Sequence, residues 1–119
     1  MKRYGKVFIK MDGNALESLP GASFEMGGVN RNTVIGGNKV LGFSEEPVPA
    51  KVECQISLAK GIELEEFRQA TDVTVSFQTD TGQTYILKNA WLAEPPKSTQ
   101  GEGGPADLIF NAVKAEEVT

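Results

Sequence analysis

Histidine is absent from this chain of 119 residues, and cysteine and tryptophan occur only once each. Without histidine, the chain lacks the commonest general base and metal ligand of enzymes. The one cysteine, Cys54, cannot form an internal disulfide, and its place among alternating apolar residues predicts a small buried side chain. We therefore expect no catalytic, cofactor-binding or metal site.

Long apolar runs and a net positive charge are also missing. No stretch is long enough to span a membrane as a helix, and no apolar segment of a secretory signal follows the basic residues 1–5, so we expect a cytoplasmic product without membrane contact. The formal net charge of −4 argues against a surface that binds nucleic acid by neutralising phosphates. The same charge is compatible with a surface along which DNA passes without binding, because mildly acidic side chains repel the phosphates.

Alternation of apolar and polar residues is the dominant pattern. It runs through the segments 6–11, 51–58, 73–78, 83–92 and 106–112, and a period of two predicts half-buried strands of an antiparallel sheet. In 83–92 the pattern places Tyr85, Leu87 and Trp91 on one face. The expected core combines inward strand positions with two helix positions: Val52, Cys54, Ile56, Leu58, Leu64, Phe67, Val75, Phe77, Tyr85, Leu87, Leu108 and Phe110.

Turns and one helix complete the predicted domain. Asp12-Gly13, Pro20-Gly21 and Asp80-Thr81-Gly82 are typical turn sequences between strands. Residues 62–70 have apolar side chains at helical spacing, with acidic residues early and a basic residue late, which suits the helix dipole. The sequence predicts a single domain, 1–119, with mainly β structure in an antiparallel sandwich or barrel and one short α-helix.

Two stretches, 27–49 and 94–105, are rich in Gly, Asn, Pro or Ser and are interpreted as long loops. Loops of this length in a small domain are usually functional or disordered. The first is the candidate for an arm that reaches another subunit, because its apolar residues are too sparse to form a core. These are Val34, Ile35, Val40, Leu41 and Phe43.

Two short motifs have catalytic or ligand-binding counterparts. Asp80-Thr81-Gly82 is the triplet that carries the catalytic aspartate of aspartic proteases, but Asp-x-Gly is also ordinary turn chemistry between strands. Gly101-Glu102-Gly103-Gly104 is glycine-rich, but Pro105 follows it and the Lys-Ser/Thr of a phosphate-binding loop is missing, which favours a flexible loop.

Several segments together resemble the tail tube protein of Mu-like contractile-tailed bacteriophages. They follow the same order over nearly the whole chain: Pro20-Gly21-Ala22-Ser23, Gly27-Gly28-Val29, Gly42-Phe43-Ser44-Glu45 leading to Pro47, 51–58, 80–85, Asn89-Ala90-Trp91-Leu92-Ala93-Glu94-Pro95-Pro96, and 101–104 before a last strand. The first 19 residues match least.

The resemblance implies a structural subunit in the virion tail, made and assembled in the host cytoplasm. In that family six copies form a ring, their strands join into one inner β-barrel, and stacked rings make a conduit for tape-measure protein and DNA inside a contractile sheath. Sheath, tape-measure and baseplate proteins are then expected partners. The alternative is a soluble β-sandwich binding module that recognises a protein or glycan through its loops.

A channel for DNA needs a polar wall that is neutral or negative, because rings of Lys or Arg would hold phosphates. Alternation gives each strand two faces but does not say which sheet lines a bore. The candidates are the polar faces of two strands: Glu53, Gln55 and Ser57, and Thr74, Ser76 and Gln78.

Overall fold

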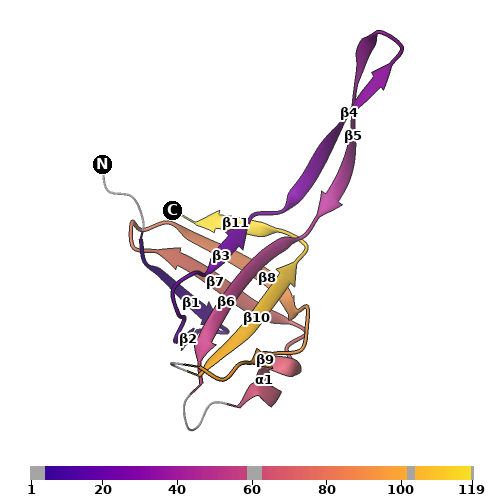
Figure 1. Ribbon diagram of the computed structural model, residues 1–119. Coiled ribbons are helices and arrows are strands. Elements are labelled where there is room, and N and C mark those ends of the chain that lie inside the picture. Colours follow the sequence, from indigo (N-terminus) through magenta and orange to yellow (C-terminus); the bar gives the residue numbers. More distant parts are fainter. Residues whose placement is uncertain (1–4, 59–62, 102–103, 119) are drawn as a thin grey trace.

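The computed structural model describes residues 5–58, 63–101 and 104–118 (Figure 1). This part of the chain is mainly β structure with one short helix, as expected. The elements in order are β1 (Val7–Met11), β2 (Asn14–Leu16), β3 (Ser23–Glu25), β4 (Gly28–Gly36), β5 (Lys39–Val48), β6 (Ala50–Ser57), α1 (Leu64–Arg68), β7 (Val73–Thr79), β8 (Thr84–Leu92), β9 (Lys97–Ser98), β10 (Pro105–Ala112) and β11 (Ala115–Val118). No helix within the described ranges is long and apolar enough to cross a membrane.

Nine of the strands form one curled antiparallel sheet, in the order β2-β1-β7-β8-β10-β6-β3, with β11 beside β8 and β9 beside β10. Strand β8 connects the two halves, because its first part pairs with β7 and β11 and its end pairs with β10. The halves face each other across the core: the ring of Phe24 on β3 stacks on Phe77 of β7 and on Tyr85 of β8. The fold is therefore a sandwich made by one sheet that turns back on itself (Figure 1).

The core follows the predicted alternation. Nine of the twelve expected residues are buried, and the other three, Leu58, Leu64 and Tyr85, are partly buried and pack against the cluster. The other buried apolar residues are mostly small or lie on β1: Ile9, Met11, Ala50, Ala70, Ala90, Ala106 and Ala112. Alanine side chains at these positions let the two halves approach closely around the larger residues.

A β-bulge in β8 makes one predicted position wrong. Val75 pairs with Leu87 but Val73 pairs with Ala90, so β8 carries one residue more than β7. Asn89 has a φ of +53° at this point, and its Nδ2 donates a hydrogen bond to Asp72 Oδ1 at 2.6 Å. Because an extra residue reverses the alternation, Ala90 is buried, whereas Trp91, which was expected to share the face of Leu87, is only half-buried.

The predicted turns are confirmed, and the helix is shorter than expected. Asp12 and Gly13 have φ values of +50° and +82°, as a two-residue hairpin turn requires. Helix α1 covers 64–68 and buries Phe67. The predicted helix start at 62 lies outside the described residues.

The predicted loop 27–49 is instead a separate two-stranded hairpin of β4 and β5. In the second predicted loop, 94–105, the short strand β9 pairs with β10, and Glu102 and Gly103 lie outside the described residues. The composition of 27–49 suggested a loop, but cross-strand hydrogen bonds form with almost any side chains when the turn fits.

Replacing Phe110 by Ala tests whether the sandwich depends on its core. Phe110 is fully buried, and losing its ring should reduce the free energy of unfolding by about 3–5 kcal/mol. Phe8→Ala is the matched control: Phe8 is 52% exposed, so its loss should cost less than about 0.5 kcal/mol. Chemical denaturation of the two variants measures both values, and equal losses would contradict this placement of the core.

Candidate assembly surfaces

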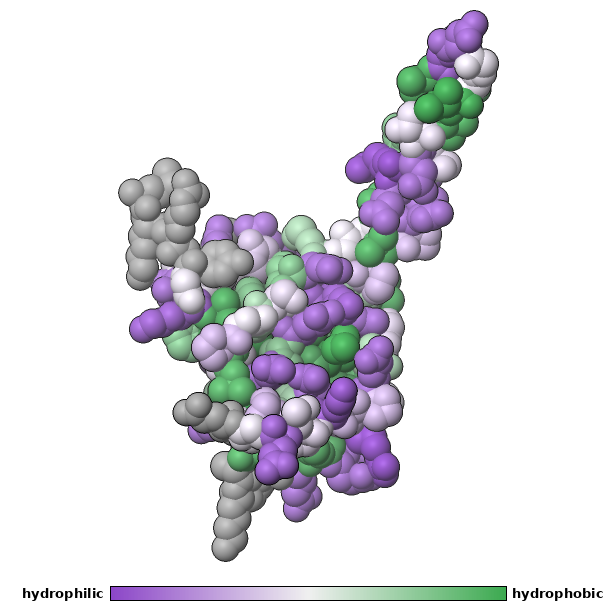
Figure 2. Space-filling view, in the orientation of Figure 1, coloured by the Kyte–Doolittle hydropathy of each residue, from purple (hydrophilic) through white to green (hydrophobic). Residues whose placement is uncertain are grey.

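Strands β4 and β5 form an arm, residues 28–48, that projects from one end of the sandwich (Figure 1). Ten extended residues reach about 30 Å, and the whole molecule measures 62 × 37 × 27 Å. The side chains of the arm are nearly all exposed, and apolar ones gather in its outer half (Figure 2). All five residues of the predicted arm set are exposed there: Val34, Ile35, Val40, Leu41 and Phe43. Val29, near the base of the arm, is also exposed and was not in the predicted set.

The outer half of the arm is apolar on both faces. Ile35 pairs with Val40, while Val34 pairs with Gly42, so a bulge places Leu41 between them. A Cβ on Gly36 would lie 2.5 Å from Leu41 Cδ1, which places Leu41 over Gly36 on the face of Val34. The turn is Gly37-Asn38, where Gly37 has the positive φ, +52°, of a two-residue hairpin.

The root of the arm is fixed by a glycine in close contact with the core. Gly27 has a φ of +77°, and a Cβ there would lie 2.5 Å from the backbone nitrogen of Ala50 and 2.8 Å from the carbonyl carbon of Pro49. Ala50 is fully buried. The direction of the arm is therefore set by backbone packed directly against the sandwich.

The structure places the six predicted lumen residues on opposite faces of the sandwich. Residues Val52, Cys54 and Ile56 of β6 point into the core, so Glu53, Gln55 and Ser57 point out of that half. On β7, Val75, Phe77 and Thr79 are buried, and Thr74, Ser76 and Gln78 therefore point outward on the other half. One bore can be lined by only one of the two sets.

The two outer faces differ in charge and polarity. On the β6 face, Lys51 Nζ is 2.6 Å from Glu53 Oε1, and Gln55 Nε2 donates to Asp107 Oδ1 at 2.7 Å. The hydrogen bond to Glu53 and, to a smaller extent, the attraction between the two charges raise the pKa of Lys51. This face also carries Glu25, which is cross-strand to Lys51, and Lys97, which is cross-strand to Asp107. Three carboxylates, Glu25, Glu53 and Asp107, therefore accompany two lysines, a small acidic excess.

The β7 face is more apolar. Phe8 is 52% exposed and lies cross-strand from Gln78. Ser76 lies between Lys10 and Ile86, and Ile86 is followed across the sheet by Glu116. Exposed aromatic side chains such as Phe8 belong to the residue types that are enriched at protein interfaces.

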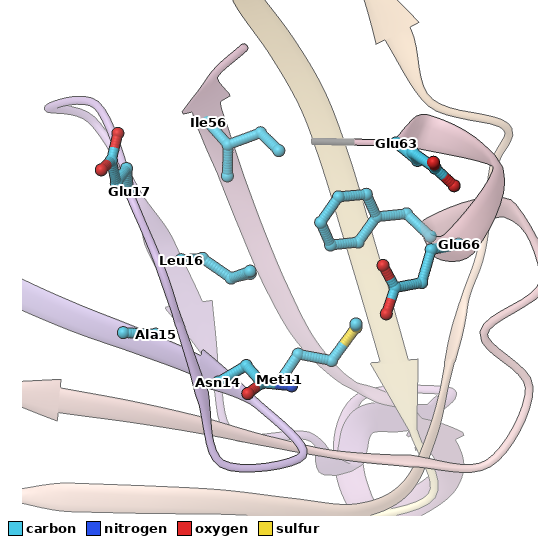
Figure 3. Close-up of a pocket in the computed structure, with 9 residues that line it drawn as sticks. Met11, Asn14, Ala15, Leu16, Glu17, Ile56, Glu63 and Glu66 are labelled. Carbon is cyan, nitrogen blue, oxygen red and sulfur yellow. The ribbon is translucent and has the colours of Figure 1, made fainter. Parts of the chain in front are cut away.

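A pocket of about 280 Å³ lies between α1 and the β1–β2 hairpin (Figure 3). Its floor consists of Met11, Leu16, Ile56 and Phe67, and three carboxylates, Glu17, Glu63 and Glu66, stand at its rim. Sequence patterns missed this pocket, because its residues come from two parts of the chain, the β1–β2 hairpin and the stretch from β6 to α1, that only the fold brings together.

Asp80, the residue of the protease-like triplet, has a structural role. Asp80 lies in the β7–β8 turn, where its Oδ1 accepts a hydrogen bond from the Gly5 backbone N–H at 3.3 Å. Gly82, with a φ of +95°, completes that turn. Burial raises the pKa of the Cys54 thiol to about 12, so this cysteine is not a ready nucleophile. Among the described residues no His, Cys, Asp or Glu cluster is placed to hold a metal ion.

Comparison with known proteins gives consistent matches over nearly the full chain. The profile of the phage tail tube protein family matches residues 1–117. The chain is 40% identical to the tail tube protein of Escherichia phage Mu, over 98% of this chain and 96% of that protein. It is 38% identical to the Mu-like prophage FluMu tail tube protein of Haemophilus influenzae, over 96% and 94% of the two chains.

Solved structures share the fold at low sequence identity. The sheath/tube terminator of an extracellular contractile injection system matches with a TM-score of 0.64 at 12% identity, covering 96% of this chain and 94% of that one. Hcp1 from Flavobacterium johnsoniae matches with a TM-score of 0.61 at 13% identity, covering 93% of each chain.

Gly27→Ala tests the fixed root of the arm. An added Cβ meets backbone atoms at 2.5 Å in a left-handed conformation, so the free energy of unfolding should fall by about 1–3 kcal/mol. Gly5→Ala is the control, since nothing lies within 4 Å of a Cβ there. Thermal unfolding compares the variants, and an unchanged Gly27→Ala protein would show that the root can move away from Ala50.

Proposed function

This chain belongs to the phage tail tube protein family, and on that premise we propose that six copies form a ring and that rings stack into a hollow conduit for DNA. The chain is a structural subunit of the virion tail, and it is not an enzyme. We place its folding and assembly in the host cytoplasm. Sheath, tape-measure and baseplate proteins are its proposed partners.

The single observation that carries the assembly is the arm. It exposes a cluster of apolar side chains well away from the sandwich, so no core of its own chain covers them. Exposed apolar surface of this kind marks an interaction site in a stable protein. A neighbouring subunit that covers these side chains would remove that surface from water, which is favourable by about 25 cal/mol per Å².

The β6 face is the proposed bore. Its polar side chains Glu53, Gln55 and Ser57, together with acidic neighbours, would repel DNA phosphates rather than hold them. The half-sheet behind this face has short edges, β3 on one side and β9 on the other. Joining such edges around a ring leaves no strand unpaired.

The β7 face then lies on the outside of the tube, toward the sheath. Its exposed Phe8 and its partly exposed Ile86 suit a protein partner better than a DNA channel. Thr74, Ser76 and Gln78 belong to this outer surface in the proposed tube. A soluble module that binds a protein or glycan through its loops is less favoured, because the longer of the two predicted loops is a β-hairpin.

Shortening the arm tests the assembly. Because Val29 pairs with Pro47, residues 30–46 can be replaced by an Asn-Gly turn that closes the hairpin at this pair. The variant should remain folded with the same thermal unfolding midpoint, since the arm adds nothing to the core, but it should form no tubes in negative-stain electron microscopy. Normal tubes from this variant would contradict a role of the arm in assembly.

Paired lysine substitutions test which face lines the bore. Gln55→Lys with Ser57→Lys should give tails that form but eject DNA poorly, with recovery at higher salt, because rings of cations bind phosphates. Ser76→Lys with Gln78→Lys adds the same charge to the opposite face and is the matched control. Phage ejection assays measure DNA release by both double variants. A salt-dependent defect in the Ser76→Lys, Gln78→Lys variant alone would indicate that the β7 face lines the bore.

A further inference from the structure

We infer that the tip of the arm inserts into the pocket between α1 and the β1–β2 hairpin of a second copy of this chain. The inference rests on the proposed assembly and deepens it by naming the surface that receives the arm. Two surfaces of complementary chemistry lie at opposite ends of the molecule, and no other described residue of the chain covers either of them.

The receiving pocket combines an apolar floor with an acidic rim. Side chains of Met11, Leu16 and Ile56 point toward its centre, and Glu63 and Glu66 stand on the α1 side (Figure 3). The described residues provide no ion pair for either glutamate, nor for Glu17 on the opposite side. The volume of about 280 Å³ equals about nine water molecules at ~30 Å³ each, room for one or two aliphatic side chains.

The arm tip has the matching properties. Ile35, Val40 and Leu41 are all at least 60% exposed. Beside them, Lys39 follows the Gly37-Asn38 turn, is exposed, and has no ion pair with any described residue. The outer half of the arm is narrow and apolar on both faces, so it fits a recess better than it fits a flat surface. When the tip enters, Lys39 faces the three carboxylates at the rim of the pocket.

Geometry requires the pocket of another molecule. The arm leaves one end of the sandwich and points away from it, whereas α1 lies at the other end (Figure 1). The fixed root at Gly27 keeps the arm from folding back. A tip-to-pocket contact between two copies is head-to-tail, so the acceptor has its own free tip and the contact repeats. Such a repeating contact can join one ring of the proposed tube to the next.

Charge distinguishes this pocket from the other recesses near the surface. A second groove runs beside Val7, Phe8 and Leu19, and Lys6 lines it. A third recess, of about 560 Å³, has both Lys10 and Glu17 in its lining. The carboxylates of a fourth, Glu53 and Asp107, already bond to Lys51 and Gln55. Lys39 of an entering tip would meet a like charge in the grooves that contain Lys6 or Lys10, whereas at the α1 pocket it would meet carboxylates that no described residue pairs. The acidic rim therefore decides which recess receives the tip.

Site-directed disulfides test the contact directly. Asn38→Cys places a thiol at the tip, and Asn14→Cys or Glu17→Cys places one at the pocket rim; the native Cys54 is buried and stays protonated, so it does not compete. Tip and rim variants, purified separately and mixed under oxidation, should give at least about tenfold more linked dimer than tip mixed with Ser76→Cys, a difference equivalent to about 1.4 kcal/mol. Ser18→Cys reports the second groove.

Linkage at the rim supports the inference whether or not long tubes form. Linkage no greater than with Ser76→Cys, or greater with Ser18→Cys, overturns it. The proposed tube is tested separately. If wild-type protein forms neither rings nor tubes in electron micrographs, the tube is contradicted, and the yield of linked dimer still decides whether the contact exists.

Charge exchange provides the second measurement. Lys39→Glu alone, or Glu63→Lys with Glu66→Lys alone, should raise the protein concentration needed for assembly by about tenfold, because attraction becomes repulsion. Combining the three substitutions should restore most of that loss, whereas Lys114→Glu, a distant exposed control, should change little. Equal assembly of all variants, or no recovery in the combined one, would overturn the inference.

Discussion

Burial of apolar side chains between two halves of one sheet is the interaction on which the rest of the structure depends. The inward residues of β6 and β10 meet those of β1 and β7, with Phe24 stacked on Phe77 and Tyr85 between the halves. Small residues such as Ala50 and Ala112, both fully buried, bring the backbones together. Because this core is complete without the arm, β4 and β5 are free to serve another purpose.

The arm shows how a stable domain can carry surface that only assembly covers. Backbone hydrogen bonds hold it straight, and Gly27 against Ala50 fixes its angle. Its apolar tip gains nothing within the single chain. Exposed apolar surface at the end of a stiff hairpin favours contact with another molecule beyond the sandwich, and such a contact can link successive subunits of a tube.

The outer faces complete the division of tasks. Side chains on the β6 face pair with one another, as Lys51 does with Glu53 and Gln55 with Asp107, which leaves a hydrated surface with little attraction for phosphate. The β7 face retains exposed Phe8, which suits a protein neighbour. In the proposed tube one of these surfaces would face DNA and the other would face protein, and a two-sided sandwich supplies both.

The amino-acid sequence by itself determined the five core strands β1, β6, β7, β8 and β10, most of their inward positions, and three turns. Alternation identified Val52, Ile56, Leu108 and Phe110 as core, since a strand buries every second side chain whatever its partner. It named the arm's apolar residues but interpreted 27–49 as a loop, because Gly and Asn lower strand propensity and only pairing partners show a hairpin.

Tertiary structure alone decided the rest. The bulge at Asn89 moved Trp91 out of phase, the six lumen candidates divided between opposite faces, and the pocket formed where α1, β6 and the β1–β2 hairpin meet. Each of these depends on which segments distant in the chain lie together. A period of two carries information about a strand's own faces, and it carries none about what lies across from them.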